Sequence, residues 1–245
     1  MKAVSYGRFI FGLSALMFGV ITLMWHDADA WEGLPILSLP FGAIIGDILA
    51  LAQIFGGIAM LSARSARPAS IVLGAVYVIF SLASIPPIVA APTTYAPYVG
   101  FFEFFSLVFG ALASYAATQT SAERAEVLGR LARLGFGICT VSFMLAQIAY
   151  PKITADLVPK WIPPNPMFWM ILTTIAFGLA AIAILINRQA RLALRLMTLM
   201  LALFGVLVWV PILIAHPEGH FNWSEFALNY VITGSAGLVA ELRSF

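Results

Sequence analysis

The sequence predicts an all-α integral membrane protein, and three observations carry this prediction. First, 62% of the 245 residues are hydrophobic and only 10% are charged, whereas a soluble domain usually carries about 25% charged residues. Second, the apolar residues form eight runs long enough to cross a bilayer. Third, the basic residues gather in the loops on one side of these runs.

Each of the eight runs predicts one transmembrane helix, because a spanning helix needs about 20 mostly apolar residues. The fifth and the last run are the shortest. Proline occurs late in the third and seventh runs, where neighbouring helices can satisfy the freed carbonyl groups. The predicted spans cover residues 8–25, 41–62, 69–91, 98–118, 134–150, 166–187, 194–215 and 226–240.

The distribution of charge predicts the orientation. With eight spans both termini lie on one side, and 11 of the 13 basic residues fall there, with only Lys152 and Lys160 on the other. Lys and Arg accumulate on the cytoplasmic face. We therefore expect a multi-pass protein of a bacterial inner (plasma) membrane with cytoplasmic termini, its three histidines lying on the outer face.

The two halves of the chain resemble each other at a spacing of 124 to 125 residues. Each half contains four predicted spans, so both insert in the same direction, as in parallel repeats of some transporters. We predict two four-helix bundles, residues 1–118 and 133–245, joined by a cytoplasmic linker at 119–132 that forms a short helix. The matches are RFIFG at 8–12 with RLGFG at 133–137, PIV at 87–89 with PIL at 211–213, and Gly110 with Gly234.

The stretch after the first run, MWHDADAWEG at 24–33, raises the question of a signal peptide, because Ala28-Asp29-Ala30 has the pattern of a cleavage site. The first run matches the internal fifth run, and it exceeds the 7–15 residues of a signal core. We expect it to be retained as the first span.

Four stretches resemble the DoxX-like membrane proteins, and the resemblance covers both halves as two tandem units. It implies a non-catalytic accessory subunit of a quinone-linked redox system, with a redox protein as partner and quinone nearby. The family usually has a glutamate where this chain has Gln53. The stretches are QIFGGIAML at 53–61, VPKWIPP at 158–164 before Phe168-Trp169, INRQARLA at 186–193 and WSEF at 223–226.

Two acids inside predicted spans suggest a binding pocket. Asp47 and Glu103 lie about 9 and about 7.5 Å deep from the outer side at 1.5 Å per residue, and intramembrane acids usually face an interior or a cavity. The candidate outward polar pocket comprises Asp47, Gln53, Glu103 and His26. The alternative is two interfacial acids that meet water and headgroups. In the second half the position matching Asp47 is Thr173 or Thr174, so any pocket is asymmetric.

His216, Glu218 and His220 are weak candidates for metal ligands. Helical spacing would align the two histidines, but Pro217 and Gly219 make a helix there unfavourable. His26 and the acids at 27–32 could add ligands only if the two loops met. We therefore predict no metal site.

Three functions remain open from the sequence. The first is the accessory redox subunit, the second is a small-molecule carrier with a site between the halves, and the third is a structural scaffold. The chain lacks nucleotide, haem and nucleophile-elbow motifs, so we expect no catalytic residues of its own. The partners expected are the lipid bilayer and a redox protein, and nucleic acid is not expected.

Overall fold

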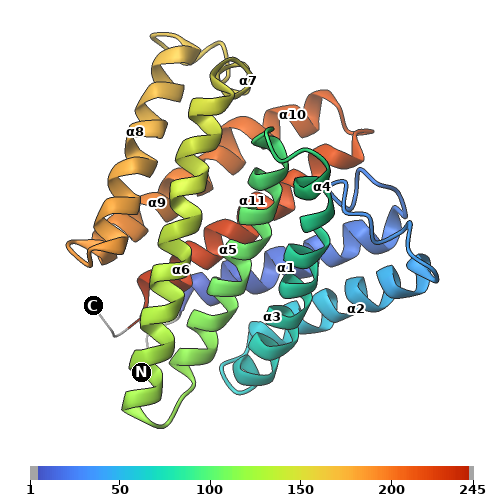
Figure 1. The fold of residues 1–245 in the computed structure, drawn as a ribbon, viewed down its shortest axis with the longest axis vertical. Helices are drawn as coiled ribbons and strands as arrows, with labels where there is room; N and C mark the ends of the chain where they lie inside the picture. The colour runs from blue at the N-terminus through green and yellow to red at the C-terminus, as the bar shows by residue number, and fades with distance from the viewer. Residues whose placement is uncertain (1–4, 243–245) are drawn as a thin grey trace.

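The computed structural model describes residues 5–242, and every regular element in that range is helical (Figure 1). The elements are α1 (Tyr6–Met24), α2 (Gly42–Met60), α3 (Ala66–Ala83), α4 (Ile85–Ala90), α5 (Ala96–Ala117), α6 (Ala122–Ala149), α7 (Pro151–Asp156), α8 (Pro166–Leu185), α9 (Ala190–Phe204), the π-helix η1 (Gly205–Trp209), α10 (Val210–Ala215) and α11 (His220–Ala240).

Seven helical stretches within residues 5–242 are long and apolar enough to cross a membrane, which makes the chain a multi-pass membrane protein. They are α1, α2, α3 with α4, α5, α6, α8, and α9 through α10. The predicted eighth span, 226–240, lies within α11, which is not apolar enough to join the seven. It carries His220, Glu225 and Asn229, and every residue from 227 to 240 except Tyr230 is buried.

The predicted spans are interrupted where proline occurs. The third breaks after Ser84, and α4 starts with Pro86 and Pro87 in its first turn. The seventh contains η1 just before Pro211. Proline has no N–H to donate and its ring crowds the preceding turn, so the chain changes helix type or direction there.

The linker predicted at 119–132 is not a separate helix. Most of it forms the first turns of α6, which runs unbroken for 28 residues from Ala122. Ser121 caps this helix by accepting a hydrogen bond from the Arg124 N–H, and side-chain caps of this kind satisfy a free donor of the first turn. The join between the two halves is therefore a short turn after α5.

The long helices form two rings that share a wall. The first ring is α1, α2, α3, α5 and α11, in which each helix contacts the next, and α11 contacts α1. The second ring is α5, α6, α8, α9 and α11, closed in the same way. The helices α5 and α11 belong to both rings. They approach closely at Gly110, where a Cβ would lie 2.8 Å from the Cα of Ser235.

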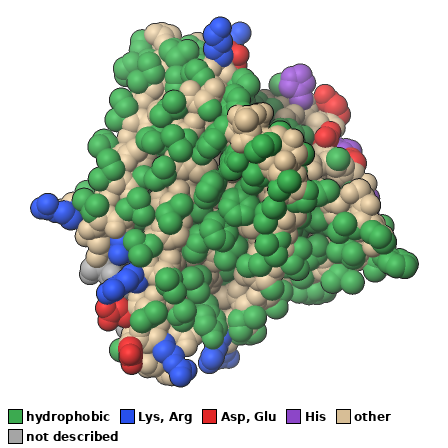
Figure 2. Space-filling model, viewed as in Figure 1, with side chains coloured by type: hydrophobic (Ala, Val, Ile, Leu, Met, Phe, Trp, Pro, Cys, Tyr) green, Lys and Arg blue, Asp and Glu red, His purple; other side chains and the backbone are tan. Residues whose placement is uncertain are grey.

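The outer surface of the helices is apolar (Figure 2). Large hydrophobic side chains are exposed at helical spacing, which water would penalise and lipid accepts. Examples are Ile44 and Ile48 on α2, Ile171, Ile175 and Leu179 on α8, and Leu192, Leu196, Leu199 and Leu203 on α9.

The two described ends of the chain lie together. The Ser5 hydroxyl donates to Glu241 at 2.5 Å, and the Gly7 N–H donates to the same carboxylate at 3.0 Å. In Figure 2 most of the visible basic side chains gather at the lower left, on the side of both termini, and the histidines lie at the upper right beside acids. Lys2 and Arg243, which entered the predicted charge asymmetry, lie outside the described residues.

Candidate functional site

Aromatic side chains fill the interior of the first ring. Phe80 is fully buried and makes edge-on contacts with four other rings, at centroid distances of 5.4 to 6.3 Å. Aromatic pairs in this geometry add to the stability gained from burial. These rings pack directly against one another in the interior. They form the first-ring aromatic cluster, which consists of Phe18, Trp31, Tyr77, Phe80 and Phe104.

The interior of the second ring is hollow. A cavity of about 720 Å³ lies among α5, α6, α8, α9, η1 and α11. It begins beside α7 and the loop after it, and its lining extends down α8 to Phe177. Phe177 is eleven residues beyond the start of α8, so the cavity extends about 16 Å along that helix at 1.5 Å per residue. That is about half of a hydrocarbon core of about 30 Å.

Three glutamates from three different elements line this cavity. Glu103 comes from α5, Glu225 from α11, and Glu32 from the connection between α1 and α2. The carboxyl groups of Glu32 and Glu225 interact directly, and Glu103 lies close enough to both to affect them electrostatically. The lining contains no Lys, Arg or His, so the cavity has no positive side chain to balance these acids.

Glu32 lies outside the spans, and its environment disfavours the charged form. Burial raises the pKa of Glu32 well above its usual range, and the negative charge of Glu225 raises it further, while a hydrogen bond with Ser224 acts in the opposite direction. Burial and a nearby like charge are the two usual causes of such a shift. The Oε1 atom of Glu32 is buried without a hydrogen-bond partner, so this carboxyl retains a free acceptor.

Neutral polar groups line a second part of the cavity. The Gln147 amide oxygen accepts hydrogen bonds from the Thr174 hydroxyl at 2.7 Å and from the Thr173 hydroxyl at 3.2 Å. The Asn229 amide donates to the Leu201 carbonyl at 3.0 Å. Gln147, Thr173 and Asn229 all line the cavity, so α6, α8 and α11 each contribute an uncharged polar side chain.

Aromatic rings make up much of the remaining wall. Phe177 packs edge-on against Phe143 and Phe204, at 5.9 and 6.3 Å between centroids. Near the outer end, Trp169 donates to the Pro163 carbonyl at 2.9 Å, which holds the loop after α7 against the start of α8. An apolar wall with a few convergent polar groups is typical of small-molecule sites.

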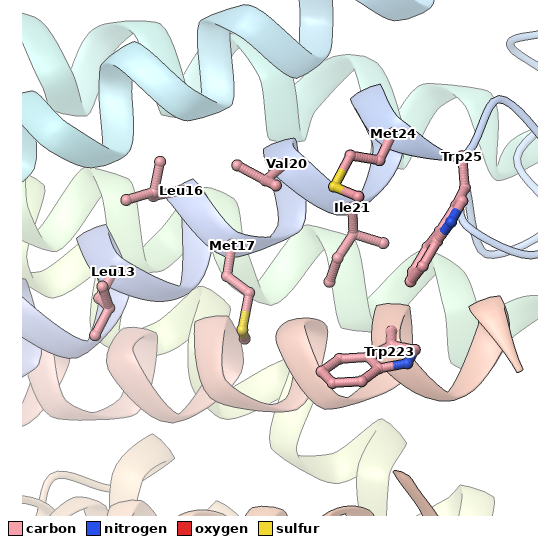
Figure 3. Close-up of a pocket in the computed structure, with 8 residues that line it drawn as sticks. All are labelled: Leu13, Leu16, Met17, Val20, Ile21, Met24, Trp25 and Trp223. Atoms are coloured by element: carbon pink, nitrogen blue, oxygen red, sulfur yellow. The ribbon is translucent and has the colours of Figure 1, made fainter. Parts of the chain in front are cut away.

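A second hollow is smaller and different in kind (Figure 3). It has a volume of about 350 Å³ and lies between α1 and α11, where Met17 and Ile21 point toward Trp223. Its lining is entirely apolar: Leu13, Leu16, Met17, Val20, Ile21, Met24, Trp25 and Trp223. This groove suits a lipid chain and offers no group for chemistry.

The structure divides the pocket predicted from the sequence. Glu103 lines the second-ring cavity, but Asp47 does not. Asp47 instead contacts His26, with 2.5 Å between its Oδ1 and the histidine Nε2, and both side chains are more than 40% exposed. Gln53 is fully buried, and neither atom of its amide has a hydrogen-bond partner. Thr173, which with Thr174 is the polar residue nearest to the position matching Asp47 in the second half, does line the cavity.

The weak metal candidates also separate. His216 lies 3.6 Å from Glu218, whereas His220 contacts Asp27 at 2.5 Å and stacks on Trp25 at 4.1 Å. The loop after α1 thus meets the start of α11, and the contact between Asp27 and His220 joins the two. Nowhere in residues 5–242 do three His, Cys, Asp or Glu side chains form a group that could hold a metal ion.

The contact with His220 affects the ionisation of Asp27, which lies outside the spans. Partial burial tends to raise its pKa, but hydrogen bonds from the Ala30 N–H and from His220 outweigh this, and the net effect lowers the pKa. The folded state therefore favours the charged form of Asp27.

Sequence reasoning missed Glu32, Glu225, Gln147 and Asn229. Glu225 was placed just outside the last span, because the apolar run begins at Phe226, but α11 begins earlier at His220. A signal was available, since a helix beginning at His220 puts Glu225 and Asn229 four residues apart on one face.

No known family, curated protein or solved structure matches this chain. The resemblance to DoxX-like proteins therefore remains a prediction from the quoted stretches, and the site is interpreted from its own geometry.

Proposed function

We propose that this protein is a membrane carrier that takes a small molecule into the second-ring cavity. The observation that carries the proposal is a cavity of about 720 Å³ with acids, amides and aromatic rings on its wall. Ligand pockets typically measure about 300–1,000 Å³ and combine an apolar lining with a few polar groups. The scaffold alternative gives no reason for a hollow interior with buried acids.

The proposal treats α11 as an eighth span. Its 21 residues correspond to about 31 Å of helix, which is enough for the hydrocarbon core. Contacts with α1, α5, α6 and α9 surround it, so its polar side chains face protein and cavity, where intramembrane polar groups are usually found. Both termini are then cytoplasmic in a bacterial-type plasma membrane, and the cavity faces the outer side.

The proposal also treats the chain as a tandem repeat. Each contact in one half has a counterpart in the other: α1 with α2 and α6 with α8, α3 with α5 and α9 with α11, α1 with α11 and α6 with α5. The Tyr98 hydroxyl donates to the Pro92 carbonyl at 3.1 Å, and 125 residues later the Trp223 N–H donates to the Pro217 carbonyl at 3.0 Å. Both bonds brace the start of the last long helix of a half.

An accessory subunit of a redox system is the second candidate. The aromatic rings along the cavity, Phe143, Phe177 and Phe204 among them, could stack on a quinone ring. This candidate predicts that the protein purifies with an oxidoreductase and that quinone is present in its lipid extract. If the protein purifies with neither an oxidoreductase nor quinone, the redox-subunit candidate is excluded.

Cysteine accessibility tests the carrier proposal. The one native cysteine, Cys139, is buried, so a Cys139→Ala background allows a single thiol to be introduced as Thr173→Cys. A carrier must expose its site to each side in turn. We therefore expect a membrane-impermeant methanethiosulfonate to label this thiol in both right-side-out and inside-out vesicles.

The matched control is Leu172→Cys, the neighbouring position on α8, whose side chain is 43% exposed on the lipid-facing surface. Lipid keeps a thiol protonated and unreactive, so this variant should label at least tenfold more slowly. Labelling of Thr173→Cys from one side only, or at the rate of Leu172→Cys, would contradict the carrier proposal.

A further inference from the structure

We infer that the second-ring cavity binds a monovalent organic cation with a hydrophobic body, because Glu103 and Glu225 face an aromatic wall without any basic side chain. The inference rests on the proposed function and names the chemical class of its ligand. It follows from three properties of the cavity: its charge, its unpaired acceptor and its shape.

The acids of the cavity have no cationic partner among residues 5–242. A carboxylate in a low-dielectric interior is stable only when it is paired or hydrogen-bonded, and otherwise it takes up a proton. The ion pairs of the described chain are His26–Asp47, Arg130–Glu126, His216–Glu218 and His220–Asp27, and none includes a cavity acid. A cation that enters the cavity would stabilise the ionised form of these acids.

The unpaired acceptor provides an independent sign of a ligand. Glu32 lines the cavity, and its Oε1 atom is buried without a hydrogen-bond partner. A buried acceptor without a partner costs about 1–3 kcal/mol. An ammonium group would satisfy this acceptor, since each of its N–H groups donates and none accepts.

The arrangement of the acids favours an organic cation over a metal ion. Within residues 5–242 the acids do not form a group of three that could coordinate one metal ion. The other walls carry Trp169, Trp209, Phe143 and Phe177. Aromatic faces attract cations through the ring quadrupole and accept apolar groups as well.

A charge-selectivity experiment tests the inference on the Thr173→Cys protein. Two methanethiosulfonates of similar size are compared, one with a trimethylammonium group and one with a sulfonate. We expect the cationic reagent to react at least tenfold faster in right-side-out vesicles, after correction for reaction with free thiol. The ratio of the cationic to the anionic labelling rate should fall severalfold in Glu103→Gln and Glu225→Gln. The ratio should persist in Glu218→Gln, which removes an exposed acid outside the cavity.

Protection by tetraphenylphosphonium gives a second readout. This hydrophobic monocation should slow labelling of Thr173→Cys, and the half-protecting concentration should rise about tenfold in Glu225→Gln. Decylubiquinone is the neutral comparison. If both thiol reagents react equally and only decylubiquinone protects, the cation inference is overturned while an accessible cavity remains.

The failure of the two proposals can therefore be told apart. Labelling from one side only removes the carrier proposal, whatever the charge of the reagent. Labelling from both sides without any preference for the cation removes the ligand class alone. The comparison of the two thiol reagents on the Thr173→Cys protein retains all three cavity acids. The test therefore remains possible even if a glutamate variant fails to fold.

Discussion

The two rings share α5 and α11, yet one is filled and the other is hollow. Phe18 in the first ring and Phe143, 125 residues later, are both phenylalanine. Tyr77 and Phe104 of the aromatic cluster, however, correspond to Leu201 and Leu228 at a spacing of 124. The two rings have a similar order of helices and differ in the volume of a few side chains. Where the second ring has leucine in place of an aromatic residue, the smaller side chain leaves space for the cavity.

Removing a ring from the first-ring aromatic cluster gives the largest expected effect. Phe80→Ala should lower the free energy of unfolding by about 3–5 kcal/mol, because a fully buried phenylalanine leaves a cavity behind. Phe204→Ala, 124 residues later, should cost only about 1.5–3 kcal/mol, since its side chain already borders a cavity and mainly loses burial. Denaturant titration of both variants in detergent micelles measures the difference, and equal losses would break the comparison between the rings.

Two buried glutamines offer a second comparison. Gln53 has no hydrogen-bond partner for its amide, so Gln53→Leu should raise the free energy of unfolding by about 1–3 kcal/mol, the cost of an unsatisfied buried group. Gln147 accepts hydrogen bonds from two threonines, so Gln147→Leu should lower it. Denaturant titration measures both variants. A loss of stability in Gln53→Leu would mean that the Gln53 amide stabilises the folded state.

The smallest effect concerns pH. Glu32 has a raised pKa in the folded state, so below the ordinary glutamate pKa of about 4.3 both folded and unfolded states are protonated and no penalty exists. As pH rises toward the folded pKa, only the unfolded state releases its proton, and folding stability falls. Glu32→Gln should lack this part of the decline, so its melting temperature should gain on that of the wild type as the pH rises above about 4.

The control for the pH experiment lies in the first ring. Phe80→Ala changes no ionisable group, so its stability difference from the wild type should not depend on pH. A Glu32→Gln difference that is equally flat would show that Glu32 ionises as freely in the folded state as in the unfolded one.

The sequence predicted the helices well and the site only in part. Apolar length located the seven spans, and proline positions marked the breaks near Ser84 and η1. Glu103 was found because an acid within an apolar run is conspicuous. Glu32 could not be found, since its place at the cavity depends on a loop that folds across α11, and no local pattern encodes that contact.

The predicted pairing of Asp47 with Glu103 rested on similar depth in the membrane. The depth of a residue gives its level along the helix, but the neighbours of its side chain also depend on its direction around the helix axis. Asp47 contacts His26, while Glu103 lines the cavity of the second ring. Residues at the same level on different helices can therefore serve different surfaces.

The contact at Gly110 has a mechanical consequence. The shared helices α5 and α11 approach most tightly where this glycine meets Ser235, so the contact can act as a fulcrum between the rings. Gly110 lies fourteen residues from Ala96, which is a lever arm of about 21 Å at 1.5 Å per residue. A tilt of about 10° about this point would displace the outer end of α5 by about 4 Å, comparable to the width of an aromatic ring.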